Sequence, residues 1–576
     1  MGVRPAKFES AGKTSEHYIP GVYTRRHTVP AGSGVSSGNL CIIGHSNGGE
    51  PFKMYDFADK SEAKQYLFNG QLLDGVTNAF NGSNDFVPQH VMAMRVNEGT
   101  QSSLILKRGA ENIIKIPSAD FGPHCNQLKL WLKKGTEPGT VRLIADFKGE
   151  AITADNIGQK LFSLSYIGEG VSASYAISNY GITLKAADGD GNVIDSYEFL
   201  WDDIETIYQL IAVINDTDAY HATTIIKDPD ARTNLIDAVP STEFEETAAI
   251  IRGDCTALIN ALKNISYFDS DEIELVEDAP RMLPDLTDSY IYFTGGSEGA
   301  YTVEQWMKAL TELEKYDIQC IATPSTEHFV HVLISDHCAE MSLIDKKQER
   351  QFIVGNAIGT SIDDTIAAAS ELNSEYGSLV FNSAIANDPF TTAKEHISGG
   401  MLACKIAGME AALSPNNPVT NKVLKVNGFG EELSTTQMNK LIKNGVLCCG
   451  KNDDGELVVI RAVTTLQRDN LALNERSMVR EALYMDRDLR KAFSRKVGSG
   501  ENPSESDILN ILKNKANEWA ELGYIVVGDE GLIHGASVKF DGDAIYLTNG
   551  KYLTAPKNFI FITSVNEVYT STTRVK

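Results

Sequence analysis

The run from Leu40 to Gly49 constrains the fold more than any other part of the sequence. Five apolar or small residues, Leu40 to Gly44, directly precede His45-Ser46-Asn47-Gly48-Gly49. A short apolar run that ends in glycines and small polar residues is typical of a buried strand that leaves a sheet through a tight turn. The sequence therefore predicts a strand at residues 40–44 that opens an α/β unit.

The same run also contains the Gly-x-Ser-x-Gly pattern of serine hydrolases, with Ser46 in the place of the nucleophile. In those enzymes a helix follows the turn directly, and its backbone N–H groups help to stabilise the oxyanion. Here Pro51 disfavours a helical Glu50, and no helical apolar pattern begins before about Ser61. We favour a strand-to-loop exit, and the alternative function is a serine hydrolase that uses the turn Gly44-His45-Ser46-Asn47-Gly48.

The order of short motifs around this strand resembles that of the contractile tail sheath proteins of long-tailed bacteriophages (myoviruses) and related contractile injection systems. Their pattern opens with Pro-Gly-Val-Tyr, followed by a strand ending in Gly, a Gly-rich exit with Pro, two helices and a strand ending in Arg-Val. A second block has Phe-Thr-Gly-Gly-Ser-Glu-Gly before a helix. The matching segments here are residues 20–23, 40–51, 60–68, 72–80, 91–96 and 293–310, and the resemblance covers 20–108 and 288–576.

The chain is predicted to have a mixed α/β multidomain fold. Alternating strands and helices predict one discontinuous, largely parallel α/β sheath domain, made of residues 39–115 and 288–420. Strands and hairpin turns predict a β-rich insertion domain at residues 116–287. A hairpin and two long amphipathic helices predict an α+β C-terminal domain at residues 421–564. A chain of 576 residues is long enough for several such cores.

The two ends, residues 1–38 and 565–576, lack a core-forming pattern and are expected to be extended arms. An extended segment has unpaired N–H and C=O groups, and pairing it with the edge strand of another subunit satisfies both chains. The residues expected to pair between subunits are Val22, Tyr23, Thr24 and Arg25 in the first arm, and Val568, Tyr569 and Thr570 in the second.

The resemblance implies a structural subunit, not an enzyme, that needs no cofactor. Such a subunit polymerises as helical, stacked hexameric rings around the tail tube and contracts to drive the tube through the host cell envelope for genome delivery. The implied partners are other copies of the chain through exchanged arms, the tail tube protein, and the baseplate and tail terminator proteins. The implied location is the virion, after assembly in the host cytoplasm.

A basic helix is expected near residues 475–495. Its mixture of acidic and basic side chains is most often a solvated face. The C-terminal domain of a sheath protein lies against the inner tube, however, so the resemblance implies that Arg487, Arg490 and Lys491 face an acidic tube surface.

The composition disfavours two classes of partner. There are 52 Lys and Arg against 77 Asp and Glu, a net charge of −25, whereas affinity for nucleic acid comes mainly from cationic contacts with phosphate. No apolar run approaches 18 residues, so membrane insertion is not expected. Eight scattered cysteines, most beside apolar residues, predict buried free thiols.

Two motifs could hold a metal ion, and both have simpler interpretations. His328, His331 and Cys338 share a predicted helix face and could bind zinc, but interleaved apolar residues favour a helix packed on a sheet. Residues 188–192 begin like a calcium loop but lack its Gly and its final Glu, which favours a hairpin turn. A third class of function, a monomeric binding module built on the insertion, also stays open.

Overall fold

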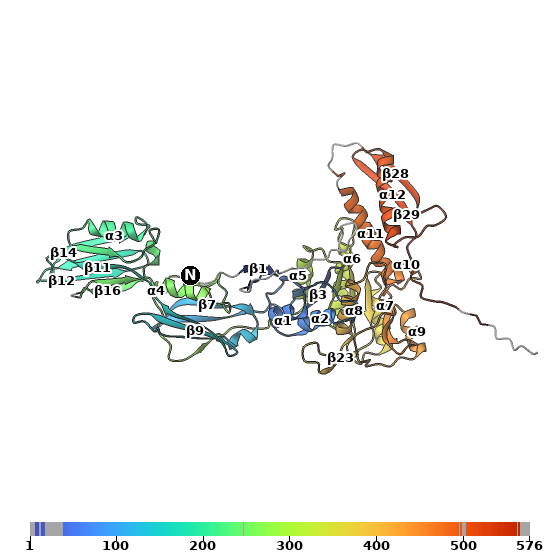
Figure 1. The fold of residues 1–576 in the computed structure, drawn as a ribbon, viewed down its shortest axis with the longest axis horizontal. Helices are drawn as coiled ribbons and strands as arrows, with labels where there is room; N and C mark the ends of the chain where they lie inside the picture. Colours follow the sequence, from blue (N-terminus) through green and yellow to red (C-terminus); the bar gives the residue numbers. More distant parts are fainter. Residues whose placement is uncertain are drawn as a thin grey trace, which may run out of the picture.

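The structure is a computed structural model that describes residues 38–245, 247–494, 496–497, 503–561 and 563–564, and the backbone of residues 6–10 and 13–17. The molecule is elongated (Figure 1). A β-rich body lies at one end, a second β-rich body follows it, an α/β body comes next, and two long helices with a hairpin project from the far side of the α/β body.

One eight-stranded sheet forms the centre of the α/β body, and its six inner strands are parallel. The two edge strands, β27 and β4, run antiparallel to their neighbours. The prediction of a strand at residues 40–44 is correct, and this strand, β3, lies inside the sheet. In spatial order the strands are β27 (Leu457–Arg461), β26 (Val446–Lys451), β22 (Gly377–Val380), β21 (Gln351–Gly355), β20 (Cys320–Ala322), β3 (Leu40–Gly44), β5 (Val91–Arg95) and β4 (Met54–Phe57).

Helices cover both faces of this sheet, because successive side chains of a strand point to opposite sides. In β3, Leu40 and Ile42 pack in one buried cluster, while Cys41 and Ile43 pack in the other. Both clusters are apolar, which explains why a parallel strand shows a continuous apolar run. The first cluster includes residues of α1 (Lys60–Leu67), α2 (Gln71–Phe80) and α8 (Gly399–Ala411), and the second includes residues of α5 (Val303–Leu313), α6 (His328–Met341), α7 (Ile362–Leu372) and α9 (Thr435–Lys443).

The insertion consists of two β-rich bodies with separate cores. The proximal subdomain, residues 101–158 and 253–294, has a core that includes Leu130, Leu143 and Leu258. Its elements are β6 (Gln101–Arg108), β7 (Glu111–Phe121), η1 (Pro123–Gln127), β8 (Lys129–Lys134), β9 (Val141–Phe147), β10 (Glu150–Ile157), α4 (Asp254–Lys263), β18 (Glu274–Leu275) and β19 (Ile291–Tyr292).

The distal subdomain, residues 159–252, has its own core, which includes Phe162, Leu184 and Leu210. The chain enters and leaves it at adjacent points, since the Gly253 N–H donates to the Gln159 carbonyl at 2.9 Å. Its elements are β11 (Lys160–Tyr166), β12 (Ser172–Ile177), β13 (Gly181–Ala187), β14 (Val193–Leu200), α3 (Ile207–Asn215), β15 (Tyr220–Thr224), η2 (Thr233–Leu235), β16 (Val239–Glu243) and β17 (Ala249–Arg252).

The C-terminal body packs two helices against a hairpin. Tyr484, Met485, Trp519 and Tyr524 form the centre of its small core. Its elements are α10 (Leu471–Asn474), α11 (Arg476–Ser494), α12 (Glu505–Glu521), β28 (Ile533–Asp541) and β29 (Ala544–Lys551). Two minor sheets complete the fold, one of β23 (Ala384–Asn387), β24 (Lys394–Ile397) and β25 (Gly428–Phe429), the other of β1 (Ala6–Ser10) and β2 (Lys13–His17).

The fold confirms the predicted mixed α/β class, but some segments differ from the prediction. The hairpin β26–β27, placed by sequence in the C-terminal part, is hydrogen-bonded to β22 and so extends the α/β sheet to residue 461. The predicted start of the insertion at residue 116 falls inside β7. Within the expected N-terminal arm, β1 and β2 pair with each other. Among the described residues, no helix is long and apolar enough to cross a membrane.

Candidate functional site

The turn after β3 has no geometry for nucleophilic catalysis. Ser46 is fully buried, and its hydroxyl donates to the Leu67 carbonyl at 2.7 Å, with the Asn69 carbonyl 3.2 Å away. Its backbone is held on both sides by the Asn97 side chain. The chain then continues through a loop to strand β4, not to a helix. The Ser46 hydroxyl holds the turn against the end of α1, and nothing in the part of the chain that the structure describes supports the hydrolase alternative.

A buried arginine joins the α/β body to the insertion at this turn. Arg95, the last residue of β5, is fully buried and donates to the carbonyls of Gly49, Phe121 and Glu298 at 2.7, 3.1 and 3.0 Å. Phe121 lies at the end of β7 in the insertion, and Glu298 lies where the chain returns from the insertion to the α/β body. We call the region where Arg95 contacts Gly49, Phe121 and Glu298 the insertion seam. Burial lowers the pKa of the Arg95 guanidinium, although nearby Asp120 opposes this effect.

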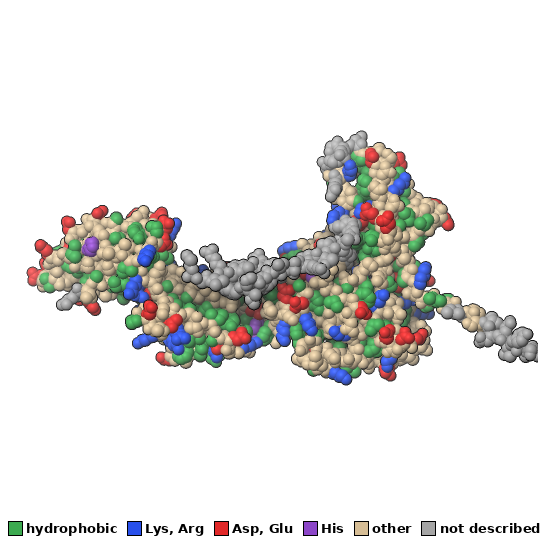
Figure 2. Space-filling model, viewed as in Figure 1, with side chains coloured by type: hydrophobic (Ala, Val, Ile, Leu, Met, Phe, Trp, Pro, Cys, Tyr) green, Lys and Arg blue, Asp and Glu red, His purple; other side chains and the backbone are tan. Residues whose placement is uncertain are grey.

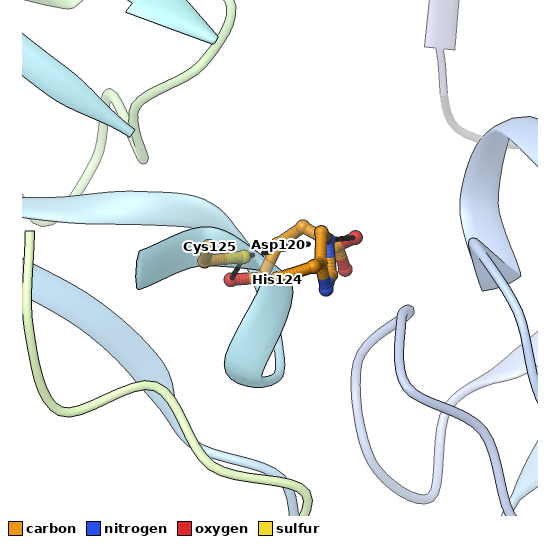
Figure 3. A group of neighbouring side chains, drawn as sticks. All are labelled: Asp120, His124 and Cys125. Atoms are coloured by element: carbon orange, nitrogen blue, oxygen red, sulfur yellow. Dashed lines mark hydrogen bonds and ion pairs between the residues drawn. The ribbon is translucent and has the colours of Figure 1, made fainter. Parts of the chain in front are cut away.

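Three potential metal ligands lie at the insertion seam, at the end of β7 and in η1 (Figure 3). Asp120 Oδ2 is 2.9 Å from His124 Nε2, and Cys125 Sγ is 3.5 Å from the same nitrogen. His124 and Cys125 are buried and Asp120 is partly exposed. Burial raises the pKa of the Cys125 thiol to about 12, so without a bound metal ion it stays protonated even beside Arg95 and Lys148. The sequence did not indicate this cluster.

The two possible metal motifs of the sequence form a packed helix and a hairpin turn, as the simpler interpretations predicted. His331 is buried, with Nε2 3.0 Å from the Ser325 carbonyl, and Cys338 is fully buried in the sheet-facing core. His328 lies at the surface beside Glu371. Residues 188–192 form the turn between β13 and β14, where the Asp188 carboxylate accepts the N–H groups of Asp190 and Asn192. All eight cysteines are free, and only Cys320 is not fully enclosed.

A serine–histidine contact lies beside the sheet of β23, β24 and β25. Ser383 Oγ is 2.7 Å from His396 Nε2 and 2.8 Å from Glu431 Oε1. In a catalytic triad the carboxylate orients the histidine, whereas here it accepts from the serine hydroxyl and also from the Ser383 N–H at 2.7 Å. A hydroxyl that donates to a carboxylate is not activated by the histidine. The cluster therefore connects three strands and is not a nucleophile.

A buried ion pair fixes α11 to the α/β body. Arg476, the first residue of α11, and Glu410, on α8, are both buried, and the guanidinium contacts the carboxylate at 2.9 Å. Burial alone would raise the pKa of Glu410, but Arg476 and Arg480 outweigh it and hold it below its usual value. Arg476 also donates to the Phe352 carbonyl at 2.8 Å. The C-terminal body is thus attached through a charge-assisted network.

The predicted tube-facing residues of α11 lie in three different environments. Arg487 is largely buried and lies 3.6 Å from Asp317 Oδ1 on the α/β body. Arg490 pairs with Glu349, directly before β21. Lys491 is exposed. Arg487 and Arg490 thus have carboxylate partners within the chain, which the sequence did not indicate. The contact of all three side chains with a tube stays a prediction.

The hairpin β28–β29 presents free edges and apolar side chains. It is a two-stranded sheet, so each strand pairs on one side only. Phe540 and Ile545 are opposite each other and both are exposed. Other exposed apolar residues of this region are Val526, Val527, Tyr546, Phe559, Ile560 and Phe561. The residues predicted to pair between subunits, Val22, Tyr23, Thr24, Arg25, Val568, Tyr569 and Thr570, lie outside the described residues.

The α/β body carries a known domain. Residues 299–465, which run from α5 to the end of the sheet, match the family described as phage tail sheath protein central domain. Residues 299–465 therefore match the central domain of phage tail sheath proteins. This confirms the resemblance seen in the sequence.

Two phage relatives match most of the chain. The tail sheath protein of Staphylococcus phage Twort is 22% identical over 455 residues, which cover 72% of this chain and 74% of the relative. A relative named "Putative tail sheath protein", of Enterococcus phage phiEF24C, is 25% identical over 434 residues, 73% of each chain. Both relatives bear the name of a tail sheath protein.

Two crystal structures share the fold of the chain. The sheath tail protein of Desulfitobacterium hafniense aligns with a TM-score of 0.53 at 14% identity, over 92% of this chain and 96% of that chain. The sheath tail protein of Listeria innocua aligns with a TM-score of 0.53 at 12% identity, over 90% and 96%. The multidomain arrangement is therefore that of sheath tail proteins.

Proposed function

We propose that this chain polymerises as helical, stacked hexameric rings around a tail tube and contracts to drive the tube through a host cell envelope for genome delivery. The sheath central domain at residues 299–465 carries this proposal. Its partners would be its own copies, the tube protein, and the baseplate and tail terminator proteins. The subunit would be part of the virion after assembly in the host cytoplasm.

The free hairpin edges support assembly by strand exchange. A two-stranded hairpin is only marginally stable by itself, and further strands with an apolar face stabilise it. An arm from a neighbouring subunit would pair with an open edge of β28–β29 and cover Phe540 and Ile545. A ten-residue extended arm spans roughly 33 Å, enough to reach an adjacent copy. Neighbours would stay tethered by their arms while their bodies move.

Contraction requires an extended lattice that is kinetically trapped at a higher free energy than a better-packed lattice. If the change buried about 400 Å² more apolar surface per subunit, transfer from water would favour the contracted lattice by on the order of 10 kcal/mol, before ordering costs. Multiplied along a tail, a tenth of this energy is sufficient. The head-to-tail contacts of a helical lattice carry the change from one ring to the next.

Deletion of residues 1–30 tests the strand exchange. Negative-stain microscopy should show tubes for the full chain and only monomers or short oligomers for the deletion variant, while its thermal midpoint stays within a few degrees. The substitution Ser46→Ala is the comparison variant: it removes the hydroxyl that holds the turn against α1 and should lower the thermal midpoint, but it should leave tube formation intact. Tubes of normal length from the deletion variant would refute exchange of the N-terminal arm. Loss of a hydrolytic activity in Ser46→Ala would instead revive the enzyme alternative.

The basic side of α11 needs a separate test, with Lys491 as the informative residue because it is exposed. Lys491→Glu should weaken binding to purified tube at low salt, and circular dichroism should show that the variant is folded. Lys513→Glu, an exposed lysine on the neighbouring α12, is the control. Equal tube binding by both variants would remove Lys491 from the proposed contact.

A further inference from the structure

The strongest unassigned cluster in the described residues is the Asp120–His124–Cys125 group at the insertion seam (Figure 3). One possible ligand atom from each of the three residues lies within 4.8 Å of the other two. The three residues lie within six positions of one another, because β7 ends at Phe121 and the 3₁₀ turn η1 folds the chain back. The cluster lies outside the sheath central domain, which begins at residue 299.

The spacing of the ligand atoms fits a small tetrahedral ion. With Zn–N of about 2.0 Å and Zn–S of about 2.3 Å, a tetrahedral site separates N and S by roughly 3.5 Å, and two ligands at about 2.0 Å by roughly 3.3 Å. The observed Sγ to Nε2 distance is 3.5 Å, and the Oδ2 to Nε2 distance is 2.9 Å. The nitrogen and oxygen need to separate by only a few tenths of an ångström.

The surroundings hold two of these ligands in place. Asp120 Oδ1 accepts the N–H groups of Gly49 at 2.6 Å and Phe121 at 2.8 Å, which orients the carboxylate and leaves Oδ2 for another partner. The His124 ring stacks on Phe68, with centroids 4.1 Å apart, so it is not free to rotate. Its Nδ1 is buried without a partner, so the ring makes its polar contacts through Nε2. The hydrogen bonds to Asp120 are support of the kind that is typical of a metal ligand, whereas His124 Nδ1 lacks the outer partner that a ligating imidazole usually has.

We propose that Asp120 Oδ2, His124 Nε2 and Cys125 Sγ bind one zinc ion, with water as the fourth ligand. A mixed oxygen, nitrogen and sulfur donor set suits zinc better than calcium or magnesium, which prefer oxygen alone. The partly exposed side of Asp120 provides room for the water. The bound ion replaces the Cys125 proton, and the two anionic ligands neutralise it. Arg95 and Lys148, the cations closest to the cluster, act against the charge of the ion.

Zinc at this position would stabilise the contacts of the insertion seam. The ligand turn contacts the α/β body through Asp120 and Gly49 and through His124 and Phe68. An ion that fixes this turn therefore stabilises the junction between the insertion and the sheath domain. Because zinc binds the folded chain and not the open seam, saturating zinc should raise the thermal midpoint.

Titration of the untagged full chain with Co²⁺ tests the site directly. One equivalent should bind, with a thiolate-to-cobalt charge-transfer band in the near ultraviolet and the visible bands of tetrahedral cobalt, and Zn²⁺ should displace it. Cys125→Ser should abolish the thiolate band, and His124→Gln should weaken binding by more than the roughly 10- to 100-fold that loss of an outer partner of a ligand costs. Cys255→Ser, in the same proximal core, is the control and should bind like the wild type.

The wild-type spectrum decides the proposal even if a variant fails to fold. Absence of stoichiometric Co²⁺ or Zn²⁺ binding by the wild-type chain, or binding without a thiolate band, overturns it. A thiolate band that persists in folded Cys125→Ser also overturns it, because another cysteine would then be the ligand. Circular dichroism of each variant establishes that it is folded.

Discussion

Glu481 shows how much depends on the partner of a buried charge. It lies on α11 with a fully buried carboxylate, and neither oxygen accepts a hydrogen bond of ordinary geometry. Burial raises its pKa to about 8, and the backbone of Thr554 offsets only part of this effect. Glu410, equally enclosed, keeps its charge because Arg476 contacts it. Helix α11 is thus anchored at its start by the ion pair of Arg476 with Glu410. The same helix carries Glu481, whose carboxyl group burial tends to keep neutral.

This difference predicts the pH dependence of stability. An acid with a higher pKa in the folded than in the unfolded chain binds its proton more tightly when folded. The stability that protonated Glu481 contributes is therefore fully present below about pH 4.3 and is lost as the pH rises through about 8. Relative to wild type, Glu481→Gln should gain stability between pH 5 and pH 8.5, by on the order of 3 kcal/mol. Urea unfolding at both pH values measures it.

An exposed acid provides the control for this measurement. Glu530→Gln, on the loop before β28, should leave the difference between the two pH values unchanged. If Glu481→Gln and wild type lose stability in parallel from pH 5 to pH 8.5, then Glu481 is ionised in the folded chain and has a partner that we have not identified.

At this scale the sequence predicts some environments and misses others. The apolar neighbours of His331 and Cys338 correctly indicated a packed helix, because their spacing on one helix face is a local property. Asp120, His124 and Cys125 were missed because their spacing matches no metal-binding motif. Only the turn from the end of β7 into η1 brings their side chains together. The partners of Arg487 and Arg490 were missed because they lie more than a hundred residues away in sequence.

Elements were predictable where their signal is local. The turn at Asn452–Gly455 predicted the hairpin of β26 and β27, and that hairpin is present. Its place in the α/β sheet depends on pairing of Val446 with Leu379, and no short-range pattern reports a pairing across that separation. The same limit applies to the insertion, whose strands were visible but whose division into two cores was not.

A charge swap tests the docking of helix α11. Arg490, partly exposed, pairs with the largely buried Glu349. Arg490→Glu and Glu349→Arg should each lower the free energy of unfolding, since like charges then face each other. The double variant should recover most of the loss, with a coupling energy of about 1 kcal/mol from urea unfolding. Additive losses in the double variant would show that the pair does not hold the helix.

The whole molecule distributes its charge unevenly. Residues 159–252 contain 5 Lys and Arg and 16 Asp and Glu, a net charge of −11 out of −25 for the chain. This distal subdomain lies at one end of the elongated molecule, away from the central sheet (Figure 1), and Figure 2 shows acidic side chains along its rim. Neighbouring copies that bring these ends together repel one another, and salt screens that repulsion over about 8 Å at physiological ionic strength.

Removal of the distal subdomain should therefore ease assembly. A two-glycine link from Gln159 to Gly253 replaces residues 160–252, and the 2.9 Å hydrogen bond between those two residues shows that the gap is short. Because the distal core is separate, the remaining chain should fold with a thermal midpoint close to wild type. Light scattering should then show polymerisation at a lower salt concentration than for the full chain. An equal or higher salt requirement would mean that the distal subdomain contributes attractive contacts that outweigh its charge.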